Sequence, residues 1–292
     1  MLAAAKINAC LRVVGSRPDG YHLLDGIMVP VGLFDRLDFT LTSASSTKVR
    51  FSCDHPTLPL DARNLVVRAA VLFLERTDPR TDVKIELHKE IPVGAGLGGG
   101  SSDAAATLKA LNWLTAAGVD QVTLARWGLE LGADVPFFLI GRPARVRGVG
   151  EQISPLKWPV DCPVVIAFPG AGLSTGEVYA AYDRTLTRGS EDSSLQAFSR
   201  GQVPLQTVLA NDLEAVASEM YPPVRAVKRR LLELGAYAAL MSGSGSAVFG
   251  VWEERDRAQA AAEMLRTEDG IWARAVDILD HVPEIEEEAV NP

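Results

Sequence analysis

The strongest structural signal in this chain is the stretch Pro92-Val93-Gly94-Ala95-Gly96-Leu97-Gly98-Gly99-Gly100-Ser101-Ser102-Asp103. Glycine loses more backbone freedom on ordering than any other residue, so this glycine-rich stretch predicts a loop. The residues after it predict a helix with a serine N-cap and an apolar line at Ala104, Leu108 and Leu111. A glycine loop that enters a helix N-terminus directs free N–H groups and the positive end of the helix dipole to one place. This arrangement suits a phosphate group.

Three other interpretations of the stretch are weaker. A flexible linker is seldom so rich in glycine directly before a capped helix. A Walker A loop needs a lysine before the helix, and none stands there. The dinucleotide pattern G-x-G-x-x-G matches residues 94–99, with Asp120 near the expected acidic position. That fold needs a strand that runs into the first glycine and a parallel strand after the helix, but Pro92 intervenes and residues 112–131 have a helical pattern.

Length and composition predict a globular protein of two domains. The chain has 292 residues, of which 47% are hydrophobic, and no apolar run approaches the length of a membrane span. The N-terminus lacks the pattern of a signal peptide, and Cys10, Cys53 and Cys162 form no close pair, so we expect a reducing cytoplasmic location. The net charge of −8 argues against a nucleic-acid surface. The scattered histidines predict no zinc site.

The N-terminal residues predict a strand hairpin. Residues 5–15 alternate as a strand does, which places Lys6 and Asn8 on one face, either in a site or toward solvent. The turn 17–20 then returns the chain through Tyr21 and His22 to a second strand at 26–31. Tyr21 and His22 therefore lie at the mouth of a hairpin, where they either bind a ligand or make only an edge contact.

The middle of the chain predicts strands at 36–42, 48–52 and 83–88 and helices at 65–76 and 121–131, the last closed by Gly132. Asp134 follows in a tight connection before a strand-like run at 137–140. An aspartate there can project into a cleft or bond its own turn backbone, and local sequence alone favours the second.

Residues 142–151 are interpreted as a junction between a domain at 1–150 and one at 151–292. The second domain predicts strands at 164–168, 239–241, 247–252 and 272–278, and helices beginning near 177 and 211 and covering 222–234 and 256–266. This order suggests an α+β domain with an antiparallel sheet. The loop 242–246 is either a second ligand clamp or a plain hairpin. We expect residues 187–194 to be mobile and 284–288 to form a solvated tail.

Together these motifs resemble the GHMP small-molecule kinases, which include galacto-, homoserine, mevalonate and phosphomevalonate kinases. The matching segments are 5–8 with 17–22, 92–102, 132–136, 148–151, 211–214 and 242–245. The resemblance implies a two-domain α+β fold, with an ATP-binding domain of the ribosomal-protein-S5-like type, a ferredoxin-like C-terminal domain and an active site between them. Segment 17–22 is most similar to members that phosphorylate the 2-hydroxyl of a cytidine diphosphate ester of methylerythritol.

The resemblance also implies residue roles. Lys6 and Asp134 would be catalytic, with Asp134 as base or positioner and Lys6 stabilising charge. The substrate would contact Asn8, Tyr21, His22, Thr175 and Tyr179, with Tyr21 and Tyr179 stacked on either side of cytosine and His22 at its edge. The implied ATP-binding residues are Asn64, Lys89, Pro92, Val93, Gly94, Ala95, Gly96, Leu97, Gly98, Gly99, Gly100, Ser101 and Ser102. Mg²⁺ would be held mainly by ATP phosphates, without a dedicated protein site.

Two functional alternatives remain open at this point. One is another GHMP kinase with a different acceptor, and the other is a non-catalytic binding protein of the same fold. We expect a small-molecule substrate, no nucleic acid or membrane partner, and a monomer or weak homodimer. We also expect the N–H groups of residues 98–100 to contact phosphates, where a Cβ at Gly99 would crowd the close backbone approach and would require a φ that other residues avoid.

Overall fold

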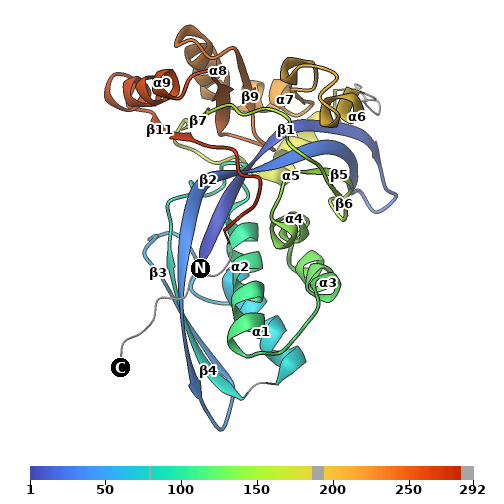
Figure 1. Ribbon diagram of the computed structural model, residues 1–292, viewed down its shortest axis with the longest axis vertical. Helices are drawn as coiled ribbons and strands as arrows, with labels where there is room; N and C mark the ends of the chain where they lie inside the picture. Colours follow the sequence, from blue (N-terminus) through green and yellow to red (C-terminus); the bar gives the residue numbers. More distant parts are fainter. Residues whose placement is uncertain (79, 186–193, 284–292) are drawn as a thin grey trace.

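The computed structural model describes residues 1–78, 80–185 and 194–283. The segments expected to be mobile (187–194) and solvated (284–288) lie outside these residues, except for Ser194. Two parts are visible: helices α1 to α4 lie on one side of a long curved sheet, and helices α7 to α9 lie at the other end of the molecule (Figure 1). Two long strands, β1 and β2, run through both parts.

In the described part of the chain, the larger sheet has seven strands in the order β3-β4-β2-β1-β8, with β5 paired to β2 and β6 to β5. Its strands are β1 (Leu2–Ser16), β2 (His22–Ser43), β3 (Lys48–Cys53), β4 (Thr81–His88), β5 (Ala144–Gly148), β6 (Gln152–Pro155) and β8 (Ala210–Asn211). Two predicted strands, 26–31 and 36–42, are one continuous strand, β2. The register shift that pairs Ala4 with Phe34 and Ala5 with Val31 is a bulge that bends β2 without ending it.

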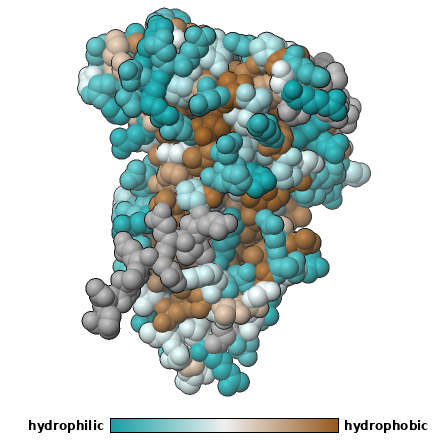
Figure 2. Space-filling view, in the orientation of Figure 1, coloured by the Kyte–Doolittle hydropathy of each residue, from teal (hydrophilic) through white to brown (hydrophobic). Residues whose placement is uncertain are grey.

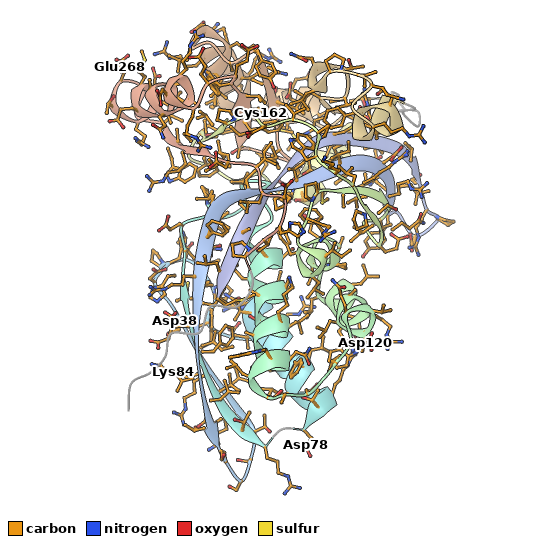
Figure 3. All side chains as sticks on the ribbon, in the orientation of Figure 1. Asp38, Asp78, Lys84, Asp120, Cys162 and Glu268 are labelled. Atoms are coloured by element: carbon orange, nitrogen blue, oxygen red, sulfur yellow. The ribbon has the colours of Figure 1, made fainter. Side chains whose placement is uncertain are left out.

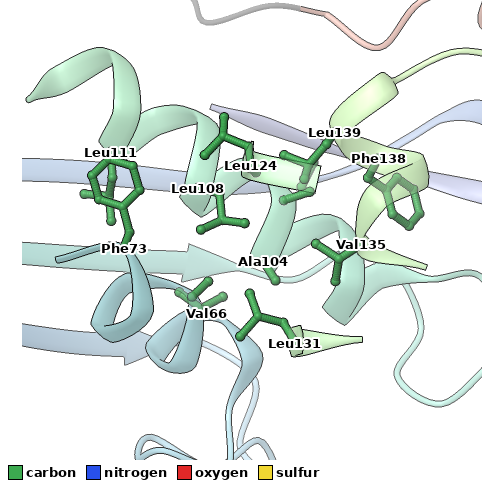
Figure 4. Close-up of a cluster of buried hydrophobic side chains, with 14 of the residues drawn as sticks. Val66, Phe73, Ala104, Leu108, Leu111, Leu124, Leu131, Val135, Phe138 and Leu139 are labelled. Atoms are coloured by element: carbon green, nitrogen blue, oxygen red, sulfur yellow. The ribbon is translucent and has the colours of Figure 1, made fainter. Parts of the chain in front are cut away.

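Four helices pack on this sheet: α1 (Leu65–Thr77), α2 (Gly99–Leu114), α3 (Gln121–Leu131) and α4 (Val135–Ile140). The predicted helices 65–76 and 121–131 are confirmed, and Gly132 is the C-cap of α3. Phe73 of α1, Leu108 of α2 and Phe138 of α4 belong to one buried cluster, with Leu108 between the two aromatic rings (Figure 4). This core supports the first turn of α2, which carries the end of the glycine loop.

Two local predictions were wrong. The N-cap of α2 is Gly98, at φ 74°, so the helix begins before the serines that were expected to cap it. The run 137–140 is helical rather than a strand, because Pro136 lies at the start of α4 and Gly141 ends it at φ 68°. A short apolar run that is buried on all sides has no periodicity to separate helix from strand.

The second sheet is antiparallel, as predicted, and within the described residues has the order β11-β7-β10-β9. Its strands are β7 (Val164–Phe168), β9 (Ala238–Met241), β10 (Val248–Val251) and β11 (Trp272–Val276). The accompanying helices are α5 (Thr175–Tyr182), α6 (Ser194–Ser199), the 3-10 turn η1 (Leu205–Thr207), α7 (Glu214–Met220), α8 (Pro223–Glu233) and α9 (Arg255–Thr267). The helix expected near 211 begins three residues later, after Asn211 has joined β8.

A shared core joins the two parts. Ile7 and Ala9 of β1 pack in one cluster with Ile166 of β7 and Phe249 of β10. Hydrophobic residues are visible between the two parts of the molecule, whereas the outer helices are largely hydrophilic (Figure 2). The strand face that carries Lys6 and Asn8 is therefore opposite to a face buried against the second sheet. No helix in the described ranges combines the length and apolar character needed to cross a membrane.

Candidate active site

A cavity of about 440 Å³ lies where the two parts meet. Most residues predicted from the sequence line it: Lys6, Asn8, Asn64, Lys89, Pro92, Val93, Gly94, Ala95, Gly96, Leu97, Gly98, Gly99, Gly100, Ser101, Asp134, Thr175 and Tyr179. Tyr21, His22 and Ser102 do not. Sequence reasoning missed several lining residues, among them Arg63, Gly243 and Ser244. Arg63 is next to the predicted Asn64, and Gly243 and Ser244 lie in the loop whose role was left open.

Residues 92–98, which we call the glycine loop, use glycine where the backbone requires it. Gly94, Gly96 and Gly98 have φ values of 69°, 79° and 74°, which side-chain-bearing residues rarely adopt. Ser102 N donates to Gly98 O at 2.9 Å, as the first intrahelical bond of α2. The N–H groups of residues 99–101 precede that bond, so the helix offers them no carbonyl partner. They form an anion site of the kind that suits a phosphate.

Gly99 does not have the backbone conformation that we expected of it. It lies in the first turn of α2, outside the left-handed region. A Cβ added there would lie 3.1 Å from Ile91 Cγ2 and 3.2 Å from Lys89 Nζ. Space beneath the helix, rather than a special φ, is what favours glycine at this position.

Residues 242–246, which we call the serine loop, pack against the glycine loop. Ser242 Oγ donates to Gly96 O at 3.0 Å and accepts from Asn8 N at 3.2 Å. Ala247 N, just after the loop, donates to Ala95 O at 3.0 Å. A Cβ at Gly96 would overlap the carbonyl oxygen of Ser242. The serine loop is therefore more than a plain hairpin: it supports the glycine loop, and Gly243 and Ser244 reach the cavity wall.

Lys6 and Asp134, distant in sequence, are brought together. Lys6 Nζ donates to Asn8 Oδ1 and, at 2.7 Å, to Gly96 O, and it lies 3.9 Å from Asp134 Oδ2. Burial lowers the pKa of Lys6, and the nearby Asp134 carboxylate partly offsets this effect. Asp134 is the N-cap of α4, but its side chain makes no capping hydrogen bond. The interpretation that Asp134 only bonds its own turn is therefore not what the structure shows.

At the α5 end of the cavity, Tyr179 pairs with His22. Their rings are stacked with centroids 4.5 Å apart and planes 24° apart. His22 Nε2 is hydrogen-bonded to Asp183 Oδ1 at 2.7 Å. Burial, with a smaller contribution from Asp134, raises the pKa of the Tyr179 hydroxyl well above its usual value, so that hydroxyl stays protonated. Asp183 was not predicted, although its position four residues after Tyr179, one helical turn on, is a signal that could have found it.

Tyr21 and Thr175 have different surroundings. Tyr21 is 64% exposed, and the Arg17 guanidinium carbon lies 6.0 Å from the centre of its ring. The aromatic neighbour that the structure gives to Tyr179 is thus His22 and not Tyr21. Thr175 is the first residue of α5, and its hydroxyl is hydrogen-bonded to Ser244 Oγ at 2.8 Å.

Asn64 and Lys89, predicted to bind adenosine, both line the cavity, and their side chains already have partners. Asn64 caps α1 by accepting from Val66 N at 2.9 Å and donates to Pro59 O at 3.1 Å. Lys89 Nζ lies between the carboxylates of Asp35 and Asp103. Asp120, the acidic residue of the rejected dinucleotide pattern, caps α3 by accepting from Thr123 N (Figure 3).

Comparison with known proteins agrees with this geometry. The family model for the GHMP kinase N-terminal domain matches residues 64–142, and that for the GHMP kinase C-terminal domain matches residues 195–270. A 4-diphosphocytidyl-2-C-methyl-D-erythritol kinase from Syntrophotalea carbinolica is 42% identical over 276 residues, which cover 94% of this chain and 97% of that protein. The enzyme of the same name from Thermus thermophilus is 44% identical over 275 residues, covering 93% and 94%.

Solved structures show the same fold. A crystal structure of 4-(cytidine 5'-diphospho)-2C-methyl-D-erythritol kinase has a TM-score of 0.81 and 43% identity, covering 95% of this chain and 98% of that one. A homoserine kinase from Cytophaga hutchinsonii has a TM-score of 0.71 at 20% identity, covering 96% and 95%, and so shares the fold alone. With both family models matched, and with relatives that align over most of the chain, this protein belongs to the GHMP kinase family.

Proposed function

We propose that this protein transfers the γ-phosphoryl group of ATP to the 2-hydroxyl of 4-diphosphocytidyl-2-C-methyl-D-erythritol, in the non-mevalonate route to isopentenyl diphosphate. The observation that carries the proposal is a site that combines a phosphate-binding glycine loop and the Lys6–Asp134 pair with a His22–Tyr179 stack. Relatives that carry this enzyme name align over more than nine-tenths of the chain. A flat cytosine ring suits an aromatic face with a polar group beside it.

The triphosphate is assigned to the glycine loop and the first turn of α2. Backbone N–H groups of residues 98–100 hold phosphate oxygens, and the helix dipole favours their negative charge. Mg²⁺ neutralises phosphate charge when it is bound. The described residues contain no cluster of three His, Cys, Asp or Glu side chains suited to a metal. The Asp134 carboxylate and the Ser101 hydroxyl are among the oxygen groups of the cavity wall, and we propose that the ion is held mainly by the ATP phosphates, with a serine hydroxyl assisting.

Phosphoryl transfer then requires positioning and control of charge. The acceptor oxygen forms a bond to the γ-phosphorus as the bond to the β,γ-bridging oxygen breaks, and that electron pair leaves with ADP. Asp134 takes the hydroxyl proton. Lys6, held by Asn8 and Gly96 O, stabilises the negative charge that develops around the transferred group.

Recognition of the cytidine group is assigned to the α5 end of the cavity. Tyr179 offers a ring face, and Thr175 offers a hydroxyl beside Ser244. His22, which lies outside the cavity lining and is bonded through Nε2 to Asp183, is proposed to reach the base edge with its other ring nitrogen or its backbone. Tyr21 is proposed to supply the second aromatic face, for which the exposed turn between β1 and β2 would close toward α5. Asn64 and Pro59 both line the cavity, joined by the hydrogen bond from Asn64 Nδ2 to Pro59 O, and Asn64 is proposed to form part of the adenosine pocket.

The organisation of the chain is also proposed. We place the domain division near residue 150, because α1 to α4 precede it and the second sheet follows it, although β6 and β8 join the first sheet. The free cysteines support a reducing cytoplasmic location, and the acidic net charge argues against a nucleic-acid partner. We further propose a monomer or weak homodimer that acts on a small molecule and has no membrane partner.

The proposal is tested by measuring ADP release with a panel of alcohols. We expect turnover with the cytidine diphosphate ester and a ³¹P NMR signal for a new phosphomonoester on its 2-oxygen. Mevalonate, homoserine and galactose should give no more than background hydrolysis. Preferred turnover of any of these three would move the protein to the alternative assignment, another GHMP kinase. Absence of turnover with every acceptor would favour a binding protein of the same fold.

A further inference from the structure

Three charged side chains lie buried together beneath the first turn of α2. They are Asp35 of β2, Lys89 of the segment after β4, and Asp103 of α2, with side-chain exposures of 0%, 4% and 3%. Lys89 Nζ donates to Asp35 Oδ2 and, at 2.9 Å, to Asp103 Oδ2. None of the catalytic steps above uses this cluster.

The cluster holds both ends of the glycine loop. Asp35 Oδ1 accepts from Glu90 N at 2.7 Å and from Ile91 N at 2.9 Å, which fixes the chain just before Pro92 to β2. Asp103 lies one turn into α2, just after the loop. Lys89 therefore joins the segment that enters the loop to the helix that leaves it, and the loop is closed at its base by a single ammonium group.

Stability alone gives a weak reason for this cluster. Two carboxylates share one ammonium away from water, and desolvating charges can cost more than their pairing returns. Burial raises the pKa of Asp103 to about 7; the Lys89 ammonium opposes this rise, and the Asp35 carboxylate adds to it. Within the described residues, Asp103 Oδ1 is buried and has no hydrogen-bond partner. A buried cluster that retains an unpaired carboxylate oxygen points to a role in holding the neighbouring glycine loop in place.

The cluster also touches the proposed phosphate site directly. A Cβ built on Gly99 would lie 3.2 Å from Lys89 Nζ and 3.4 Å from Asp35 Oδ2. Gly99 is the first residue of α2, in the middle of the N–H groups assigned to the triphosphate. Because Lys89 lies directly beside Gly99, a shift of the Lys89 side chain would move those N–H groups without acting through a third residue.

We propose that Lys89 is a positioning residue for the glycine loop, which it closes by bridging Asp35 and Asp103 so that the N–H groups of residues 98–100 are held in place for a triphosphate. The inference rests on the proposed use of ATP and deepens it. It differs from a direct contact of the Lys89 ammonium with adenosine, because that group already lies between two carboxylates. Holding the loop in its bound conformation lowers the ordering cost of binding.

Positioning of the glycine loop and direct contact with adenosine are distinguished by titrating the protein with adenosine and with a non-hydrolysable ATP analogue. In Lys89→Met we expect about tenfold weaker binding of the ATP analogue, the factor that corresponds to one charge-assisted hydrogen bond. Adenosine has no phosphates, so its affinity should stay within about twofold of wild type. Lys89→Arg, which keeps the charge, should recover part of the lost affinity.

Lys89→Met leaves two carboxylates facing each other and can fail to fold. The double variant Lys89→Met/Asp103→Asn avoids this, because the remaining carboxylate of Asp35 keeps two backbone donors. The same loss of ATP-analogue affinity is expected in it. The matched control is Lys84→Met, which removes the half-exposed partner of Glu86 on the outer face of β4 (Figure 3) and should change neither affinity.

The outcomes distinguish this inference from the proposed function. If wild type binds the ATP analogue and the double variant binds it equally well, the inference is overturned and the kinase assignment stands, even if the variant unfolds more easily. An equal loss for adenosine and the analogue would also overturn it, in favour of an adenosine contact. If wild type binds no ATP analogue, both the kinase assignment and the inference are wrong.

Discussion

The glycine loop and the serine loop both carry glycine at alternate positions, yet they have different uses. In the glycine loop, Gly94, Gly96 and Gly98 line the cavity with left-handed backbone. In the serine loop, Ser242 and Ser246 are fully buried, and their hydroxyls donate to carbonyl oxygens of Gly96 and Ala171. One loop presents backbone groups to a ligand, whereas the other satisfies backbone groups of its neighbours.

The difference follows from what comes next in the chain. The glycine loop enters α2, whose first N–H groups and dipole favour an anion. The serine loop enters β10, whose backbone groups pair with β7 and β9 and leave no comparable donors. Small residues allow the backbone of either loop to come close to another group. Whether that group is a ligand or a neighbouring loop depends on the helix or strand that follows.

The largest effect is expected outside both loops, since neither carries a carboxylate or imidazole that could accept a proton. Asp134→Asn should lower kcat by about 10²–10⁴, because the acceptor hydroxyl loses its base or positioner. Affinity for an ATP analogue should change little. The measurements are steady-state turnover and calorimetric titration, with Asp120→Asn at the surface cap of α3 as control. Near-normal turnover would remove Asp134 from the mechanism.

The contact between the loops is tested by Gly96→Ala. The new Cβ would overlap Ser242 O at a φ of 79°, so the loops must separate. We expect kcat/KM for ATP to fall by about a hundredfold, as misplaced binding groups commonly cause. Gly118→Ala, between α2 and α3 and outside the cavity, is the matched control, because its φ of 66° carries the same backbone strain and its Cβ would meet nothing within 4 Å. Equal effects of the two changes would show that the contact between the loops is not what matters.

Substitutions at the α5 end of the cavity should change binding of the cytidine ester without changing binding of ATP at the two loops. Base–aromatic stacking is worth about 1–3 kcal/mol, so Tyr179→Ala should raise the KM for the cytidine ester by about one to two powers of ten. The KM for ATP should remain unchanged. Tyr237→Ala, in the second domain away from the cavity, controls for the loss of a tyrosine. An unchanged KM for the ester would remove Tyr179 from base recognition.

The smallest effect is expected within the serine loop. Ser242→Ala removes the hydroxyl between Asn8 N and Gly96 O, at a cost of about 1 kcal/mol in the free energy of unfolding. We expect the KM for ATP to rise by about fivefold, since a supporting contact is lost and the ligand contacts remain. Urea unfolding and initial-rate kinetics would measure both. An effect as large as that of Gly96→Ala would mean that the serine loop binds the ligand itself.

The sequence by itself determined the features that depend on neighbouring residues. Helices α1 and α3 have apolar residues at helical spacing and polar N-caps, Asn64 and Asp120, so their ends were predictable to within about two residues. The glycine loop and its helix were recognisable for the same reason. The resemblance of short motifs then placed Lys6, Asp134 and Tyr179 in one site before any geometry was known.

The tertiary structure alone decided how distant residues meet. Gly98 caps α2 in place of a serine, and residues 137–140 form a helix although a buried apolar run of that length has no periodicity that separates helix from strand. The bridge from Lys89 to Asp35 and Asp103 and the stack of His22 on Tyr179 join separate elements. Periodicity and capping act over a few residues, whereas these contacts depend on which surfaces the chain buries together, and no local pattern specifies that.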